Sequence, residues 1–240
     1  MKKGTLYGIG VGPGDPEWIT VKGARVLAQC RRIFVPKSKE ERDSAALQIA
    51  QSYISAEAQV RELSFPMITD PHKLALHWDE AARQMAEVLE KGEDCCFLTL
   101  GDLFLYSTYI YLLRALRKMI PDLDVVSIPG INAFSAAAAL TEFPVGEAKE
   151  QVTIIPTADD LGAVKNALAQ GGTVVLMKIG KRLESILDIL EEEGLLDRAV
   201  FVGRAGQVGQ RIETDLRRLR TNEPTTGYLS IILVHAERPK

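Results

Sequence analysis

The chain has 240 residues, of which 46% are hydrophobic and 25% are charged. A chain of this length and composition can bury the core of one large domain or of two small ones. Its 29 basic and 32 acidic residues leave a net charge of −3, which argues against a nucleic-acid-binding surface. No apolar run approaches the ~20 residues of a membrane span, and none suits a signal peptide. With only three cysteines, we expect a soluble protein of the reducing cytoplasm.

The first half of the chain alternates between strand-like and helix-like segments. Strands are expected at 5–12, 32–36, 58–66, 95–101 and 123–130, and helices at 19–30, 44–54, 77–92, 106–119 and 132–142. Apolar, β-rich strands separated by helices indicate a parallel sheet that is covered on both faces. Residues 1–142 are therefore predicted to form an open α/β domain.

The second half begins after a polar segment, 143–150, which contains Pro144 and Gly146 and is typical of a linker. Strands are expected at 152–156, 172–178, 199–204, 210–216 and 227–236, and helices at 160–169 and 182–193. Little helix separates the last strands, so not every pair of neighbouring strands can run parallel. Residues 151–240 are predicted to form a second α/β domain with a smaller, mixed sheet.

Residues 8–20 read GIGVGPGDPEWIT, with alternating glycines directly after the first apolar run. The dinucleotide pattern G-x-G-x-x-G fails here, because its last position holds Pro13 or Asp15, and no Gly-Lys-Ser/Thr of a P-loop follows. Pro13 and Pro16 also remove two N–H groups that a phosphate would need. Two interpretations stay open: a tight structural turn, or the edge of a site for a ligand without phosphate.

Two other strand ends carry similar residues. Gly101 and Asp102 follow the strand at 95–101, and Pro129 and Gly130 close the strand at 123–130. Asp102 could cap the next helix, or accept hydrogen bonds from an ammonium group or a ribose hydroxyl. Ligands of open α/β sheets bind beyond the carboxyl ends of the strands. Three glycine-containing ends in one sheet therefore predict a concave edge that holds a flat or folded cofactor.

These stretches, in this order, resemble the tetrapyrrole methyltransferase family. The matching motifs are GVGPGDPEWIT near the start, GDLFLY at 101–106, PGIN at 129–132 and VVLMKIGK at 174–181. The likeness covers essentially the whole chain. One departure is Leu103, which stands where the family usually has proline.

Within the family, the likeness is strongest to the branch that methylates carbon 20 of precorrin-2 or of its cobalt complex in cobalamin synthesis. The stretches that favour this branch are IFVPKSK at 33–39, LMKIGK at 176–181 and GYLSIILV at 227–234. The alternatives are methylation of another ring carbon, methylation of a macromolecule, and non-catalytic binding of a tetrapyrrole or an adenosine.

The resemblance implies a two-domain α/β enzyme that holds S-adenosylmethionine, folded, in the cleft between the domains. Carried over by motif, the expected cofactor-binding residues are Pro13, Gly101, Asp102, Leu105, Tyr106, Asn132, Ala133, Met177, Tyr228 and Ser230. Met177 would pack against adenine, although a role in the core is an equal alternative.

The resemblance also implies a small-molecule substrate that carries many carboxylates. Cations at or near strand ends are therefore expected to bind it, namely Lys37, Lys178 and Arg204; ordinary surface charge is the alternative for each. The meso carbon of the ring is itself nucleophilic, so we expect no catalytic side chain. We also expect no metal ligand from the protein, because the macrocycle holds its own metal. A homodimer is expected, with the aromatic helix at 106–119 as either interface or core.

Overall fold

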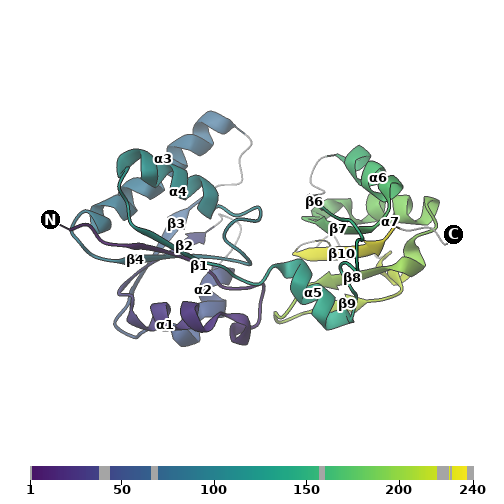
Figure 1. Ribbon diagram of the computed structural model, residues 1–240, viewed down its shortest axis with the longest axis horizontal. Helices are drawn as coiled ribbons and strands as arrows, with labels where there is room; N and C mark the ends of the chain where they lie inside the picture. Colours follow the sequence, from purple (N-terminus) through teal and green to yellow (C-terminus); the bar gives the residue numbers. More distant parts are fainter. Residues whose placement is uncertain are drawn as a thin grey trace. The chain divides into compact units, whose positions relative to one another are not determined.

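The computed structural model describes residues 2–37, 44–65, 70–156, 160–220, 227 and 229–236. It divides into two compact units, Met1–Asn132 and Ala133–Lys240, each built around its own sheet (Figure 1). The division between the units precedes the helix Ala133–Thr141, whereas the boundary expected from the sequence follows it.

The first unit is an open sheet of five parallel strands in the order β3-β2-β4-β1-β5. This confirms the parallel α/β domain predicted from alternating strands and helices. The strands are β1 (Leu6–Gly10), β2 (Arg32–Lys37), β3 (Gln59–Ser64), β4 (Cys95–Thr99) and β5 (Val125–Ile128). The helices are α1 (Val21–Gln29), α2 (Ala45–Ala50), α3 (Pro71–Leu89) and α4 (Tyr109–Met119), with short 3-10 turns η1 (Pro16–Trp18) and η2 (Gln51–Tyr53).

Helix starts in this unit follow local capping chemistry. The Thr20 hydroxyl accepts a hydrogen bond of 3.1 Å from the Gly23 N–H, which satisfies a free donor in the first turn of α1. Asp70 does the same for α3, and Pro71 occupies the first helical position. This capping pair makes α3 begin before residue 77, where the apolar periodicity alone placed its start.

The first sheet separates two hydrophobic clusters. Helices α3 and α4 cover one face of the sheet, and α1 and α2 cover the other (Figure 1). Their side chains contribute to the cluster on their own face. Successive residues of β4 point to opposite faces, so Cys95 belongs to the first cluster and Cys96 to the second. Both thiols are fully buried and unbridged.

Helix α4 contributes its apolar face to the core of this unit. Tyr109, Leu112 and Leu116 are fully buried in the cluster beneath α3. Tyr111 lies on the outer face, 51% exposed, with its ring stacked 5.2 Å from that of Trp78. The buried face of this helix is therefore core. Within the described residues, no helix has the length and apolarity that crossing a membrane requires.

The second unit holds a mixed sheet in the order β6-β7-β10-β8-β9. Its strands are β6 (Val152–Pro156), β7 (Thr173–Met177), β8 (Ala199–Gly203), β9 (Arg211–Glu213) and β10 (Ser230–His235). Among the hydrogen-bonded neighbours that the structure describes in this sheet, only β6 and β7 run parallel. Strand β10 lies between β7 and β8 and is antiparallel to both. The mixed character was predicted correctly, and all five strands fall within the expected ranges, the short β9 at the edge included. The second sheet has as many strands as the first and is not smaller in that respect.

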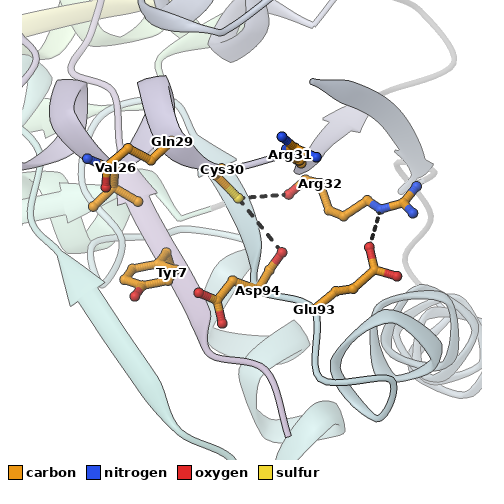
Figure 2. Close-up of a pocket in the computed structure, with 8 residues that line it drawn as sticks. All are labelled: Tyr7, Val26, Gln29, Cys30, Arg31, Arg32, Glu93 and Asp94. Atoms are coloured by element: carbon orange, nitrogen blue, oxygen red, sulfur yellow. Dashed lines mark hydrogen bonds and ion pairs between the residues drawn. The ribbon is translucent and has the colours of Figure 1, made fainter. Parts of the chain in front are cut away.

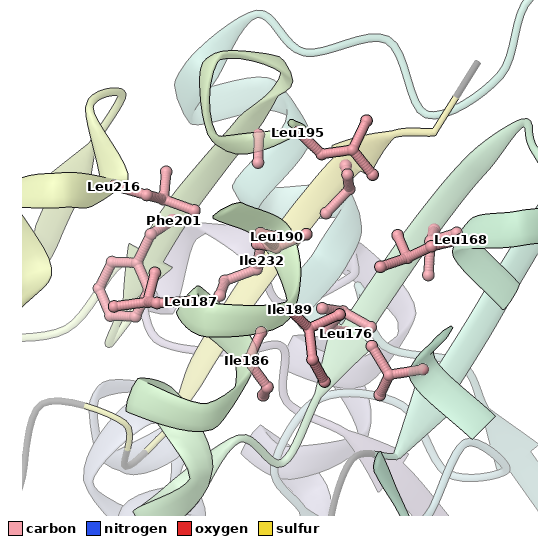
Figure 3. Close-up of a cluster of buried hydrophobic side chains, with 14 of the residues drawn as sticks. Leu168, Leu176, Ile186, Leu187, Ile189, Leu190, Leu195, Phe201, Leu216 and Ile232 are labelled. Atoms are coloured by element: carbon pink, nitrogen blue, oxygen red, sulfur yellow. The ribbon is translucent and has the colours of Figure 1, made fainter. Parts of the chain in front are cut away.

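Helices cover this second sheet on both faces. Helices α6 (Leu161–Gln170) and α7 (Leu183–Glu192) bury leucines and isoleucines against β7, β8 and β10 (Figure 3). Helix α5 (Ala133–Thr141) packs on β10 and β8. The remaining short turns are η3 (Gly180–Arg182), η4 (Leu196–Arg198) and η5 (Leu216–Leu219).

The segment 143–150, expected as a linker, lies against the second unit. The Phe143 ring stacks on the His235 imidazole with 4.1 Å between centroids. At the other end of the segment, the Thr173 hydroxyl donates to the Glu150 carboxylate at 3.2 Å. These contacts pack the segment on the ends of β7 and β10.

Candidate functional site

The carboxyl ends of β1 and β4 form the topological switch point of the first sheet. The connection from β1 to β2 runs across the sheet in one direction, and the connection from β4 to β5 runs in the opposite direction. Open α/β sheets bind their ligands at such a point. Here the two strands continue into Gly12 and Gly101, which pair through main-chain hydrogen bonds of 3.2 and 2.8 Å.

Three strand ends approach one another at this point, main chain against main chain. A Cβ on Gly10 would lie 2.6 Å from the Gly130 nitrogen and 2.7 Å from the Gly101 oxygen, closer than packed atoms allow. Gly101 differs: its φ is 72°, and no atom lies within 4 Å of where its Cβ would be. Gly10, Gly12, Gly101 and Gly130, which we call the glycine edge, therefore combine tight packing beneath with bare main chain facing open space at Gly101.

Asp102 ties two loops of this edge together. One carboxylate oxygen accepts from the Phe104 N–H at 2.8 Å, and the other accepts from the Gly130 N–H at 3.2 Å. Thr108, not Asp102, precedes the first residue of α4. The alternative in which Asp102 caps that helix is therefore wrong, and its carboxylate holds the loop after β4 against the loop after β5.

The glycine-proline loop itself is a turn that ends in a short helix. The Asp15 carboxylate accepts from the Glu17 N–H at 2.8 Å and caps η1. Pro13 is buried, and Gly12 precedes it at the glycine edge. Residues 13–16 thus form a structural turn, and Gly12 lies at the switch point. That this loop borders a ligand stays a prediction.

The loop that follows Asp102 is anchored at both ends. Leu103 is fully buried in the cluster with α3 and α4, so an apolar side chain anchors this end of the loop. Further along, the Ser107 hydroxyl lies 2.9 Å from that of Thr99 and accepts from the Tyr109 N–H. Between these anchors, Leu105 is half-buried and Tyr106 is 40% exposed with a φ of 53°.

Tyr109 supports the edge from below. Its ring lies beside Gly8 of β1, and its hydroxyl is 3.0 Å from that of Ser127 on β5. Burial raises the pKa of Tyr109, so the phenol is a neutral hydrogen-bonding group at ordinary pH. Sequence reasoning missed Ser107 and Tyr109; a hydroxyl run directly after a predicted ligand loop is the signal that could have found them.

Two of the predicted cationic residues lie at one end of the second sheet, together with Leu229, which was not predicted. Lys178 follows β7, Arg204 follows β8, and Leu229 precedes the antiparallel β10, so all three lie at the same end. Their φ values are 55°, 51° and 51°. Non-glycine residues rarely adopt this left-handed region, and such strain clusters at functional sites.

The register of β10 places the remaining candidates beside this trio. Ile231 pairs with Met177, and Ser230 pairs with Gly203. The Ser230 hydroxyl donates to the Gly227 carbonyl at 2.6 Å, which leaves its oxygen as an acceptor only. Because β10 separates β7 from β8, the main chains at Lys178 and Arg204 are two strand spacings apart, about 9.6 Å.

The other predicted residues have different surroundings. Lys37 ends β2, and its ammonium lies 2.7 Å from the Glu62 carboxylate of β3, so its charge is already paired. Asn132 closes the first unit and Ala133 begins α5 of the second. Tyr228 lies outside the described residues.

Comparisons with known proteins agree with this architecture. Residues 5–219 match the family of tetrapyrrole (corrin/porphyrin) methylases. A cobalt-precorrin-2 C(20)-methyltransferase of Salmonella typhimurium is 33% identical over 98% of this chain and 97% of its own length. A probable cobalt-precorrin-2 C(20)-methyltransferase of Methanocaldococcus jannaschii is 30% identical over 95% of each chain.

Among solved structures, the chain resembles the cobalt precorrin-4 methyltransferase CbiF. The TM-score is 0.75 at 22% identity, with 98% of this chain and 96% of that chain covered, so this likeness bears on the fold. The chain is a two-domain α/β protein of the methyltransferase class. It belongs to the tetrapyrrole methylase family.

Proposed function

We propose that the chain transfers a methyl group from S-adenosylmethionine to carbon 20 of precorrin-2 or of cobalt-precorrin-2. The observation that carries this proposal is the likeness to two cobalt-precorrin-2 C(20)-methyltransferases, which extends over at least 95% of each chain. The product is precorrin-3A or its cobalt complex, an intermediate of cobalamin synthesis.

The glycine edge suits a cofactor that carries no phosphate. Gly101 offers bare main chain to open space, a cradle that any side chain at this position would fill. The loop 13–16 lacks two N–H donors because of its prolines, and S-adenosylmethionine needs no phosphate-binding nest. We assign its methionine and adenosine parts to main-chain groups of 101–105 at this edge.

Bound S-adenosylmethionine would supply an electrophilic methyl group on its sulfonium sulfur. The acceptor carbon lies in an electron-rich conjugated ring, so no side chain needs to activate it. The chain contributes position: Asp102 fixes the loop after β4 through two main-chain hydrogen bonds. In-line positioning of this kind accounts for up to about 7–11 kcal/mol of a barrier in well-oriented reactions.

Recognition of the acidic substrate is assigned to Lys178 and Arg204. Both lie at the same end of the second sheet, in the left-handed conformation. Lysine and arginine side chains bind carboxylates through charge-assisted hydrogen bonds. The Lys37 ammonium lies 2.7 Å from the Glu62 carboxylate, so a substrate carboxylate would compete with this ion pair.

A steady-state assay with both tetrapyrroles tests this assignment. Lys178→Gln removes one charge and keeps a side chain with the same backbone strain. Loss of one charge-assisted contact of ~1.5–3 kcal/mol raises the KM for tetrapyrrole about tenfold or more, with the cofactor KM unchanged. Lys181→Gln, three residues away and exposed, is the matched control. If the KM for Lys178→Gln equals that of the control, Lys178 does not bind the substrate.

The proposal includes a homodimer, as is usual in the family. Light scattering on the purified protein measures its mass in solution. A mass of twice the 26.4 kDa chain supports the dimer, and the chain mass itself contradicts it.

A further inference from the structure

A pair of buried hydroxyl groups joins the two ends of the loop that follows β4. The Thr99 Oγ1 and Ser107 Oγ atoms lie 2.9 Å apart, and the two residues are 4% and 7% exposed. Buried hydroxyl groups need a hydrogen-bond partner, and these two provide one for each other. Neither residue is among the cofactor-binding residues expected from the sequence.

Thr99 is the member of this pair that the sheet holds in place. It is the last residue of β4 and pairs with Gly10 of β1, and its carbonyl accepts a hydrogen bond of 3.0 Å from the Val11 N–H. Side chains alternate along a strand, so Thr99 faces the same side as Phe97, the side that α3 and α4 cover (Figure 1). The hydroxyl of Thr99 is therefore presented to the start of α4, where Ser107 lies.

Ser107 connects the pair to helix α4. Its oxygen accepts a hydrogen bond of 3.1 Å from the N–H of Tyr109, the first residue of that helix. One serine hydroxyl thus contacts both the strand before the loop and the helix after it. The residues between, 100–106, form a loop whose two ends are joined by the hydrogen bond between Thr99 and Ser107.

The backbone of this loop is strained at the residue next to the pair. Gly101 and Tyr106 have φ values of 72° and 53°, and a tyrosine rarely adopts this left-handed conformation. Strained backbone persists only where the surrounding structure holds it. Ser107 directly follows Tyr106, so its hydrogen bond to Thr99 fixes the chain on one side of the strained residue.

We propose that Thr99 and Ser107 are positioning residues for the cofactor, and that their hydrogen bond orders the loop 101–105 before S-adenosylmethionine binds. This inference rests on the proposed function, which assigns the cofactor to the main chain of that loop. Binding to an ordered loop is stronger, because the ligand does not have to order it. If only a fraction of the molecules holds the loop in the competent conformation, the apparent Kd rises by the inverse of that fraction.

Calorimetric titration of the full chain with S-adenosylmethionine tests this proposal. Thr99→Val removes the hydroxyl and keeps the shape of the side chain, so we expect a Kd about fivefold above that of wild type, as for loss of one ordinary hydrogen bond. Thr99→Ser keeps the hydroxyl and is expected to bind within about twofold of wild type. Hydrogen exchange of the ligand-free protein gives a second readout, because peptides covering 100–106 exchange faster in Thr99→Val than in Thr99→Ser.

Two control variants separate positioning from a general loss of stability. Thr173→Val makes the same change at a fully buried residue of the second unit, whose hydroxyl donates to Glu150 at 3.2 Å. Cys30→Ala removes a buried hydrogen bond of the first unit, from the Cys30 thiol to the Arg32 carbonyl at 3.2 Å. Cys30 borders a cavity of about 270 Å³ at the amino end of the first sheet, the opposite end of the strands from the loop (Figure 2). Both controls are expected to lower the Tm and to leave the cofactor Kd within about twofold of wild type.

Ser107→Ala breaks the pair from its other side and replaces Thr99→Val if that variant does not fold. Its Kd is also expected to rise, and adding Thr99→Val to it raises the Kd no further, because both changes remove the same hydrogen bond. Three results would overturn the inference: a wild-type Kd in Thr99→Val, a Kd for Thr99→Ser as high as that for Thr99→Val, or an equal rise in a control. If wild type binds the cofactor and Thr99→Val binds it equally well, only this inference fails. If wild type binds no S-adenosylmethionine, the proposed function fails with it.

Discussion

Glycines of the first unit serve two distinct purposes at the residue scale. Gly10 lies where the main chains of three strand ends meet, and a side chain there would collide with backbone atoms at 2.6 and 2.7 Å. Gly101 lies at the same edge, but the space beside it is open and only its φ of 72° is demanding. A methyl group added at these two positions therefore has different consequences.

We predict that Gly101→Ala folds but loses cofactor affinity. Left-handed backbone at alanine costs about 1–2 kcal/mol, and the new methyl group occupies the proposed cofactor space, so the Kd for S-adenosylmethionine rises about tenfold or more. Gly10→Ala meets main chain that cannot yield and lowers the free energy of unfolding by about 3 kcal/mol or more. Calorimetric titration and denaturant unfolding measure the two quantities. An unchanged Kd for Gly101→Ala contradicts the cofactor assignment.

Asp102 shows where prediction from sequence stops at this scale. Its position after a strand could be predicted, because Gly-Asp follows an apolar run directly. Its hydrogen bond to Gly130 could not be predicted, because β1 lies between β4 and β5 and only the folded sheet brings the two loops together. The sequence therefore indicated the right edge but not the hydrogen bonds that shape it.

The substitution Asp102→Ala removes the hydrogen bonds from the Phe104 and Gly130 N–H groups. Each leaves a main-chain N–H without its acceptor, so the free energy of unfolding falls by about 1–3 kcal/mol, and the Kd for S-adenosylmethionine rises as the loop loosens. Asp102→Asn keeps one acceptor oxygen and retains part of both properties. Denaturant unfolding and calorimetry of the two variants rank them; equal values for Asn and Ala would mean that only the charge matters.

At the scale of elements, Leu103 is the apolar anchor of the loop 101–108. Leu103 reaches into the cluster beneath α3 and α4 and is fully buried, whereas its neighbour Phe104 is 56% exposed. The loop thus gains from packing the stiffness that a proline would supply through its ring.

Truncation of Leu103 is therefore predicted to destabilise the first unit. Leu103→Ala leaves a cavity in a packed cluster and lowers the free energy of unfolding by about 2–5 kcal/mol. Phe104→Ala, at the adjacent exposed position, changes it by about 1 kcal/mol or less. Chemical denaturation followed by circular dichroism compares the two. Similar losses for both variants would show that Leu103 does not anchor the loop.

Element type was readable from periodicity because apolar alternation and helical spacing record which face is buried. Helix α3 shows the limit: its first turn carries polar residues and was missed, although Asp70 and Pro71 mark its start chemically. The left-handed residues Lys178, Arg204 and Leu229 were unreadable for another reason. Nothing in a lysine, arginine or leucine side chain favours a positive φ, so only the sheet geometry imposes it.

At the scale of the whole molecule, each unit has its own core, and surface ion pairs occur in both. Hydrogen bonding to Arg32 lowers the pKa of Glu93 in the first unit, and hydrogen bonding to Arg217 lowers the pKa of Asp197 in the second. Lys3 lowers the pKa of Asp122 in the same way. Asp122 and Asp197 are exposed and Glu93 is partly exposed, so each contribution to stability is small.

These lowered pKa values set the sign of the pH dependence. A carboxyl whose folded pKa lies below its unfolded value stabilises the fold above the unfolded pKa, about 4, and this stabilisation is lost as pH falls through the folded pKa. We predict that the Tm falls between pH 5 and about 3, and that Arg217→Ala weakens this fall. Calorimetric scans at low ionic strength measure it, since salt screens exposed pairs. A Tm that rises on acidification contradicts the assignment.

The position of the transferred methyl group tests the account most directly. The purified protein is incubated without oxygen with S-adenosylmethionine labelled with ¹³C at its methyl group, and with precorrin-2 or cobalt-precorrin-2 in parallel reactions. NMR of the product then locates the label. The account predicts a new methyl group on carbon 20, with the faster substrate showing whether cobalt is present at this step. A methyl group on another ring carbon, or bound cofactor without transfer to either substrate, would contradict it.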